Sequence, residues 1–284
     1  MKIHRLICAT AIIFAGTAAS ASTPKQQTAA TEAAKEESLT SQTDSKLPEA
    51  SESIDSLRLT DDDYIYIADM LDVEIAAIKA VVDIEAGRTH QGFFKPGKPI
   101  INFDINMFRR FAGRRGISLA KYRRSHSEVF AGPNARRHGS TQAAQHIRLE
   151  KARTINEVTA LEGTFWGMFQ LGGFNWKKCG CSSIHEFVEL MSRSERDQLE
   201  LFANFITSTG LVKHLKNKNW ASFARGYNGP SYAARGYHTR MAKAYARHKS
   251  LERKLNDTSD ELSKKPQEST LPQQAKPINQ NNTK

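Results

Sequence analysis

The chain has little cysteine, and this excludes most of the ways in which proteins use it. Only 3 of the 284 residues are Cys, and Cys8 lies in the leading segment. Cys179 and Cys181 remain, and residues two apart rarely form an unstrained disulfide. This spacing argues against a disulfide framework. No metal-binding His motif accompanies the two residues, so we expect no zinc site, and we expect no cofactor. We interpret both thiols as structural.

The sequence also lacks any later apolar run of about 18 to 20 residues, the length that a membrane-spanning helix needs. A shorter apolar stretch, residues 6–14, follows Lys2 and Arg5 and precedes Ala19-Ser20-Ala21. This order is typical of a cleavable secretory signal peptide over residues 1–21. We therefore expect export to the periplasm or the cell exterior, without stable membrane insertion. Cys8 lies too early in the stretch for a lipoprotein anchor.

Aromatic residues are missing from residues 22–57, which are rich in Ser, Thr, Ala, Gln and Glu. Residues 251–284 are similar, with Gln, Asn, Lys and Pro prominent. Such segments bury too little apolar surface to offset their ordering entropy, so we predict a disordered linker and a disordered tail. The intervening residues 58–250 have the length of one ordinary domain, which we expect to be a monomer.

Acidic residues are in the minority within this domain. Residues 58–250 hold 30 basic and 18 acidic side chains, a surplus of 12, whereas the linker holds 3 basic and 7 acidic. An exported basic domain suits an anionic polymer such as the bacterial wall. Nucleic acid and anionic membranes remain alternatives on charge alone.

Helix signals recur along the domain. Thr60 before three Asp residues predicts a helix start, and a second helix is expected from Asp72 to Ala86, with Gly87 as its stop. Ser183 and Ser194, each with an acid three residues later, predict two more. Further helices are expected from Trp220 to about Gly229 and through Tyr245. The fold class is therefore mainly α.

One segment predicts strands instead. Two apolar runs, residues 92–94 and 100–103, flank a turn that contains Pro96 and Gly97. We expect a small β-hairpin, which makes the fold α+β.

An acid stands on the apolar face of the second helix. Ile75, Ile78, Val82 and Glu85 are spaced 3, 4 and 3 residues apart, which places them on one face. Burial and the negative end of the helix dipole both raise the pKa of such a carboxyl. Cleavage of a glycosidic bond needs an acid that stays protonated near neutral pH. The alternative is a Glu at a frayed helix end that reaches solvent. Asp83 faces elsewhere, and we expect it to be solvated.

Four motifs then follow in order along the domain. They are Val81-Val82-Asp83-Ile84-Glu85-Ala86-Gly87; Gly92-Phe93-Phe94; Phe165-Trp166-Gly167-Met168-Phe169-Gln170 with Gly173-Phe174-Asn175; and Phe223-Ala224-Arg225-Gly226-Tyr227-Asn228-Gly229-Pro230. Together they resemble the N-acetylmuramidase domain of phage endolysins and bacterial wall hydrolases, within the lysozyme-like superfamily. The resemblance covers residues 58–248.

The resemblance implies a lysozyme-like fold and a peptidoglycan hydrolase that cuts between N-acetylmuramic acid and N-acetylglucosamine. In it Glu85 matches the catalytic general acid, and Asp104 is the nearest match to a second acid. Residues 167–170 match the Gly-x-x-Gln element that lines the sugar cleft, so Gln170 is expected to bind substrate. Tyr227 and Asn228 match a Tyr-Asn pair beside the acid, in which a Tyr hydroxyl orients the carboxyl. Trp166 is a further candidate for sugar contact, or a core aromatic.

Three positions depart from the family pattern. Phe165 replaces a Ser, so a hydroxyl there is lost unless Thr164 supplies it. Residues 103–106 replace Phe-Glu-Arg-His, which shortens the acid to Asp104 and removes the His. Ala86 replaces a Ser after the acid.

Other functions fit parts of the sequence. A lytic transglycosylase breaks the same bond, and a catalytically weak module would only bind the wall. A peptidase is disfavoured, because Cys179 and His185 form the only nearby Cys and His pair.

A nucleic-acid binder would use a basic stretch with interleaved aromatics. This stretch contains Arg109, Arg110, Arg114, Arg115, Lys121, Arg123 and Arg124, with Phe108, Phe111 and Tyr122. The export signal disfavours that function, so we expect peptidoglycan and no nucleic acid as partner.

Overall fold

The computed structural model describes residues 53–87, 91–132 and 141–264. The signal peptide expected over residues 1–21 and most of the expected linker and tail lie outside these ranges. Within them, no helix is both long and apolar enough to cross a membrane.

Helices dominate the described residues. In chain order the α-helices are α1 (Asp61–Leu71), α2 (Ile75–Glu85), α3 (Ile105–Arg114), α4 (Ser127–Phe130), α5 (Gln142–Arg153), α6 (Glu157–Glu162), α7 (Ile184–Arg193), α8 (Glu195–Ser208), α9 (Val212–Lys216), α10 (Trp220–Asn228) and α11 (Tyr237–Lys264). The 3-10 helices are η1 (Ile54–Leu57), η3 (Ala120–Tyr122), η5 (Gly173–Asn175) and η6 (Pro230–Tyr232). The strands are β1 (Phe93–Lys95), β2 (Lys98–Pro99), β3 (Ile101–Phe103), β4 (Thr164–Trp166) and β5 (Leu171–Gly172). The expected α+β class is confirmed.

The helix starts predicted from capping residues are confirmed. Thr60 and Asp63 form a reciprocal capping box at α1, and Ser183 and Ser194 each accept a hydrogen bond from a backbone N–H of α7 or α8. Gly87, after α2, adopts a φ of 69°, the left-handed conformation that favours glycine at a helix end.

The predicted hairpin is correct only in its first half. β1 pairs antiparallel with β2 around the Pro96-Gly97 turn. β3, however, pairs with β4, which in turn pairs with β5 in a separate three-stranded sheet. The second apolar run therefore belongs mainly to a sheet whose other strands come some 60 residues later, and a local turn signal carries no information about such a partner.

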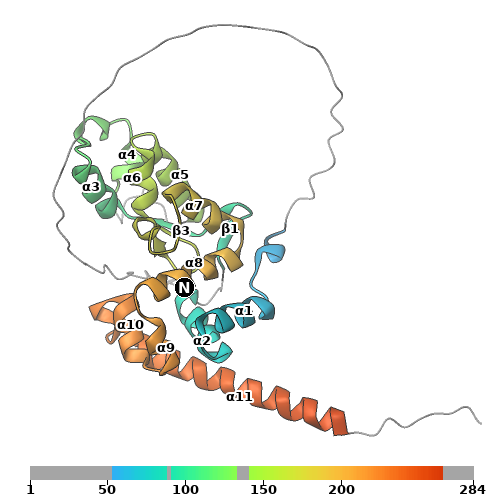
Figure 1. Ribbon diagram of the computed structural model, residues 1–284. Coiled ribbons are helices and arrows are strands. Elements are labelled where there is room, and N and C mark those ends of the chain that lie inside the picture. Colours follow the sequence, from blue (N-terminus) through green and yellow to red (C-terminus); the bar gives the residue numbers. More distant parts are fainter. Residues whose placement is uncertain (1–52, 88–90, 133–140, 265–284) are drawn as a thin grey trace, which may run out of the picture.

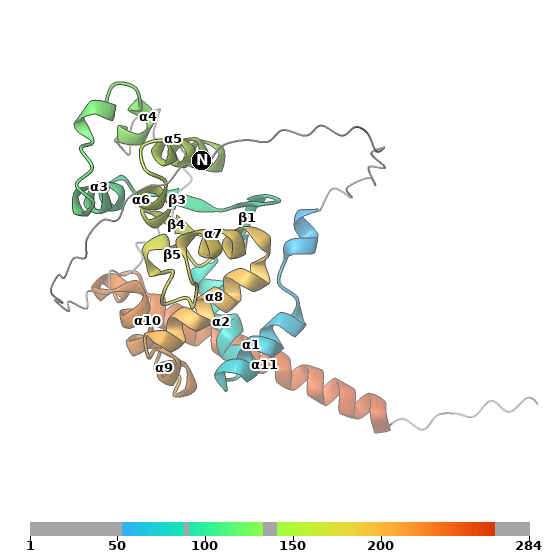
Figure 2. The same cartoon turned by 45° about the horizontal axis from the view of Figure 1, so that its top comes forward.

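The elements form two groups with α8 between them (Figures 1 and 2). α3 to α7 and the strands lie on one side of α8, while α1, α2 and α9 to α11 lie on the other. The chain passes from the second group to the first directly after α2, at the end of which Glu85 lies. Apart from a small cluster around Phe165, one continuous hydrophobic core runs through both groups.

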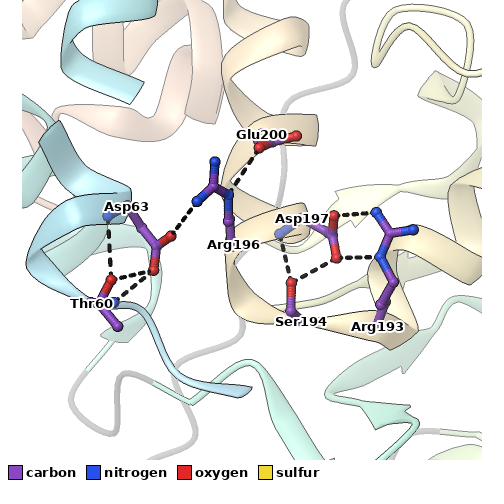
Figure 3. A network of polar contacts seen from close by, with 7 residues as sticks. All are labelled: Thr60, Asp63, Arg193, Ser194, Arg196, Asp197 and Glu200. Carbon is purple, nitrogen blue, oxygen red and sulfur yellow. Dashed lines mark hydrogen bonds and ion pairs between the residues drawn. The ribbon is translucent and has the colours of Figure 1, made fainter. Parts of the chain in front are cut away.

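A polar network ties the start of α1 to the start of α8 (Figure 3). Arg196 of α8 donates to Asp63 of the α1 capping box over 3.2 Å and to Glu200 over 3.2 Å. One turn away, Arg193 pairs with Asp197, which also accepts from the Ser194 hydroxyl. Both helix starts are thereby fixed at the junction between the groups.

The folded region extends past the expected limits at 58 and 250. At the front, η1 places Leu57 in the core with 4% of its surface exposed. At the back, α11 packs against α2 and α10 and then continues as a helix to Lys264, away from the rest of the molecule (Figure 1). Leu251 and Leu255 are exposed on this extension.

Candidate functional site

Glu85 is the last residue of α2, and its side chain is almost completely buried. Only 5% of its surface is exposed, on the same helix face as the buried Ile78 and Val82. The spacing of Ile75, Ile78, Val82 and Glu85 therefore placed the acid correctly on the buried face. The alternative of a solvated, frayed helix end is wrong. A buried carboxyl strongly prefers its neutral form unless it is paired.

The surroundings of Glu85 keep a substantial fraction of it in that neutral form up to about pH 7. Burial raises the pKa of the carboxyl to about 7, while the hydrogen bond from Asn228 and the charge of Arg240 lower it only in part. Asn228 Nδ2 donates to Glu85 Oε1 over 2.8 Å. The carbonyl oxygen of a neutral carboxyl is the better acceptor, so the bond from Asn228 to Oε1 favours Oε2 as the oxygen that carries the proton.

Asn228 reaches the acid because α10 ends there. Asn219 caps the start of the helix, and Gly229, with a φ of 75°, ends it. Asn228 itself is buried, so its side-chain amide faces Glu85 from within the core.

Tyr227 is buried beside Asn228, but its hydroxyl donates elsewhere. The bond runs over 2.8 Å to the carbonyl of Phe169, and the ring packs against Phe202 and Phe223. A phenol has a single proton to donate. The O–H proton of Tyr227 is therefore used by Phe169, and Asn228 is the donor to Glu85.

Residues 167–170 form the tight turn between β4 and β5. Gly167 and Gln170 both have positive φ, 68° and 49°, and both the backbone and the side-chain N–H groups of Gln170 donate to the Gly167 carbonyl. Tyr227 holds the same turn through Phe169. The Gly-x-x-Gln element and the Tyr-Asn pair are thus brought together, with Asn228 linking them to Glu85.

Trp166 belongs to the core. Only 3% of its surface is exposed, and its indole N–H donates to the Leu161 carbonyl over 3.1 Å. Such a ring offers no face to a sugar, so the expected sugar contact is replaced by the core-aromatic alternative. The neighbouring Thr164 is also buried and donates to the Ala160 carbonyl, so it does not replace the hydroxyl lost at Phe165.

Asp104, the expected second acid, is the N-cap residue of α3. Its Oδ1 accepts from the backbone N–H groups of Asn106 and Met107 over 2.8 and 3.0 Å. An acid directly before an amphipathic run is also a helix-start signal, and here that interpretation was missed.

Two other features of the site could not be predicted from the sequence. Asp83 was expected to be solvated, but it pairs with two residues of α11. They are Arg247 and, over 2.7 Å, His248. Arg240, also on α11, supplies the positive charge near Glu85. Arg240, Arg247 and His248 all lie more than 150 residues after α2, and no local spacing indicates such contacts.

The structure weakens the nucleic-acid alternative. Phe108 and Phe111 of the basic stretch are core residues and have no exposed face on which a base could stack. Cys179 and Cys181 are buried free thiols whose pKa burial raises, so neither is an activated nucleophile. Among the described residues, no group of three or more His, Cys, Asp or Glu side chains could hold a metal ion.

Comparisons with known proteins agree with this geometry. The N-acetylmuramidase (Muramidase) family matches residues 74–249, more than half of the chain. Among solved structures, a Burkholderia AP3 phage endolysin is similar at 34% sequence identity and a TM-score of 0.60, covering 69% of this chain and 72% of the endolysin. No functionally curated protein matches. Because the family model matches more than half of its residues, the chain belongs to the N-acetylmuramidase family.

Proposed function

We propose that this protein is a peptidoglycan hydrolase that cuts the glycan strand between N-acetylmuramic acid and the following N-acetylglucosamine. Membership of the N-acetylmuramidase family supports the substrate class. The observation that carries the mechanism is the buried Glu85, whose pKa is raised to about 7 and whose Oε1 is held by Asn228. Glu85 is proposed as the general acid.

The chemistry needs a proton on the leaving oxygen of the glycosidic bond. With Asn228 donating to Oε1, Glu85 Oε2 delivers this proton in a fixed orientation. The carboxylate that forms is then stabilised by the Asn228 amide and by the positive charge of Arg240. The same negative charge favours the positive charge that develops on the sugar ring.

Water is the proposed acceptor of the sugar: its oxygen bonds the anomeric carbon as the glycosidic bond breaks, its surplus proton passes to solvent, and solvent reprotonates Glu85. The cut leaves a reducing muramic acid end. No role in this step is assigned to Asp104, whose Oδ1 accepts the two capping bonds at the start of α3. Gln170 is proposed to contact substrate from the turn at residues 167–170.

The test is mass spectrometry of the fragments released from purified peptidoglycan, after reduction with borohydride. Hydrolysis at the proposed bond converts terminal muramic acid to muramitol. Anhydro-muramyl ends that resist reduction would instead show a lytic transglycosylase, in which the 6-hydroxyl of the sugar attacks. Reduced glucosamine ends would show that the other glycosidic bond is cut, and binding without release of fragments would indicate a wall-binding module.

We also propose that residues 1–21 direct export and are removed after Ala21, because the substrate lies outside the cytoplasm and the order of residues is that of a signal peptide. The mature protein is proposed to act as a monomer. The intact mass of the exported protein tests the cleavage site, since cleavage after Ala21 leaves Ser22 as the first residue. Recovery of full-length protein in the cytoplasm would overturn export.

A further inference from the structure

Two of the three buried polar side chains in the first two turns of α8 bond to loops outside the helices, and the proposed chemistry uses neither. Glu195 and Gln198 lie three residues apart, hence on one face of the helix, and Gln198 is completely buried. A polar group in the core is costly unless its hydrogen bonds are made. The partners of these two side chains therefore indicate what they hold.

Gln198 joins three separate segments. Its Oε1 accepts from the Met168 N–H over 2.8 Å, within the turn at residues 167–170. Its Nε2 donates to the carbonyls of Met191, over 2.9 Å, and Gly92, over 3.3 Å. The turn and the start of the hairpin are thus bonded to one amide group.

Glu195 completes the contact with the hairpin. Its Oε1 accepts from the Gly92 N–H over 2.7 Å, and its Oε2 accepts from the Leu59 N–H over 3.1 Å. Both polar groups of Gly92, the N–H and the carbonyl, are consequently held by α8. Gly92 is the residue from which the chain enters β1, seven positions after Glu85.

The two bonded loops approach Gln198 so closely that a side chain at either glycine would displace its amide. A Cβ atom on Gly92 or on Gly167 would lie 2.6 Å from Gln198 Oε1 in each case. Glycine is therefore favoured for the same reason at both positions, Gly92 and Gly167, because both pack directly on the amide of Gln198. Gly167 is further restricted to glycine by its positive φ.

We propose that Gln198 is a positioning residue for substrate binding, one that fixes the turn at residues 167–170 against the hairpin that follows the acid. The proposal rests on the proposed function, in which Gln170 of this turn contacts the sugar. Gln198 touches no substrate itself and acts through Met168 and Gly92. Neither the bond from Asn228 to Glu85 nor the bond from Tyr227 to the turn involves Gln198, so a change at Gln198 is expected to alter sugar affinity and to leave the acid in place.

The test compares Gln198→Met with Gln145→Met. Methionine is similar in length to glutamine but makes none of these bonds. Gln145 is also buried and its Oε1 accepts from a backbone N–H, that of Phe103, but it contacts neither Gly92 nor residues 167–170 through any described hydrogen bond. Kinetics are measured on soluble, uncrosslinked glycan strands at a temperature where both variants remain folded.

Gln198→Met is expected to raise KM about tenfold, to lower kcat no more than about threefold and to leave the pH midpoint unchanged. Gln145→Met is expected to keep KM within about twofold. A purely structural role would reduce the folded fraction, which lowers apparent kcat and leaves KM unchanged. Unchanged KM in Gln198→Met, or equal rises in both variants, would overturn the proposal.

A second measurement separates this proposal from the proposed function. Retention on insoluble peptidoglycan is compared between Glu85→Gln and the double variant Glu85→Gln/Gln198→Met, neither of which needs to turn over. Weaker retention of the double variant supports the positioning role even if the wild type cuts no glycan bond. Equal retention overturns it even if the wild type is active.

Discussion

Glu85 lowers the stability of the protein that it serves. Its pKa is about 7 in the folded state and near its ordinary value of 4.5 in the unfolded chain. Between these two pH values the folded protein holds a proton that the unfolded chain has lost. The free energy of unfolding therefore falls as pH rises through this window and stays lower above it. With about 1.4 kcal/mol for each pH unit, the loss amounts to about 3 kcal/mol.

Glu85→Gln should remove this loss. Glutamine has the same shape, accepts from Asn228 through its oxygen and carries no charge. We expect the variant to be more stable than wild type by about 3 kcal/mol at pH 8, and by much less at pH 4.5. Denaturant unfolding at the two pH values checks this. A difference that does not depend on pH would show that the carboxyl does not titrate in this window.

How far single residues could be predicted depended on where their partners lie. The burial of Glu85 followed from a 3.6-residue period within one helix. The roles of Trp166 and Asp104 did not follow from the family motif, because they depend on which backbone groups stand nearby. The indole meets the Leu161 carbonyl, and the Asp104 carboxylate meets the N–H groups of α3.

At the scale of elements, helix ends were predicted better than strand pairing. A cap is a contact between residues three positions apart, so Ser183 and Ser194 were sufficient to place α7 and α8. Strand pairing joins distant segments, and the sequence predicted β3 as the partner of β1 although it pairs with β4. The turn at Pro96-Gly97 was predicted correctly, but the pairing of β3 with β4 was not.

Ser194→Ala tests the importance of the cap that begins α8. The Ser194 hydroxyl accepts from the Asp197 N–H over 3.1 Å and donates to the Asp197 carboxylate (Figure 3). Its loss should cost about 1 kcal/mol of unfolding free energy. Ser192→Ala is the matched control, because Ser192 lies near the end of α7 and bonds only a carbonyl of its own helix. The control should change stability by less than about 0.5 kcal/mol; equal losses in both variants would rule out a specific role for the cap.

At the scale of the whole molecule, one folded unit between a linker and a tail was predicted from composition. Its limits were misplaced by a few residues in front and by a longer helical extension behind. The central place of α8 was not predictable, since its bonds to Gly92 span about 100 residues of sequence. Composition indicates whether a segment can bury apolar surface. It does not indicate which other segment that surface packs against.

Two deletions locate the front boundary. Removing residues 22–52 should leave the melting temperature unchanged, because this part has little apolar content. Removing residues 22–57 also deletes Leu57, which is buried, and should cost about 1.5 to 3 kcal/mol. Thermal melts of the two truncated proteins check this. A large shift with the shorter deletion, or none with the longer, would contradict the boundary.

The central claim, that Glu85 is the proton donor for glycan cleavage, is tested most directly by the rate at which Glu85→Gln releases fragments from purified peptidoglycan. The rate is measured near pH 5.5, where the wild-type acid is protonated, and the fold of the variant is verified by its unfolding transition. Glu150→Gln, the same change at an exposed pair with Arg153, is the control. Glu85→Gln should be at least about 100-fold slower than wild type and the control should match wild type. A folded Glu85→Gln protein that clears the substrate within a few-fold of the wild-type rate would contradict the claim.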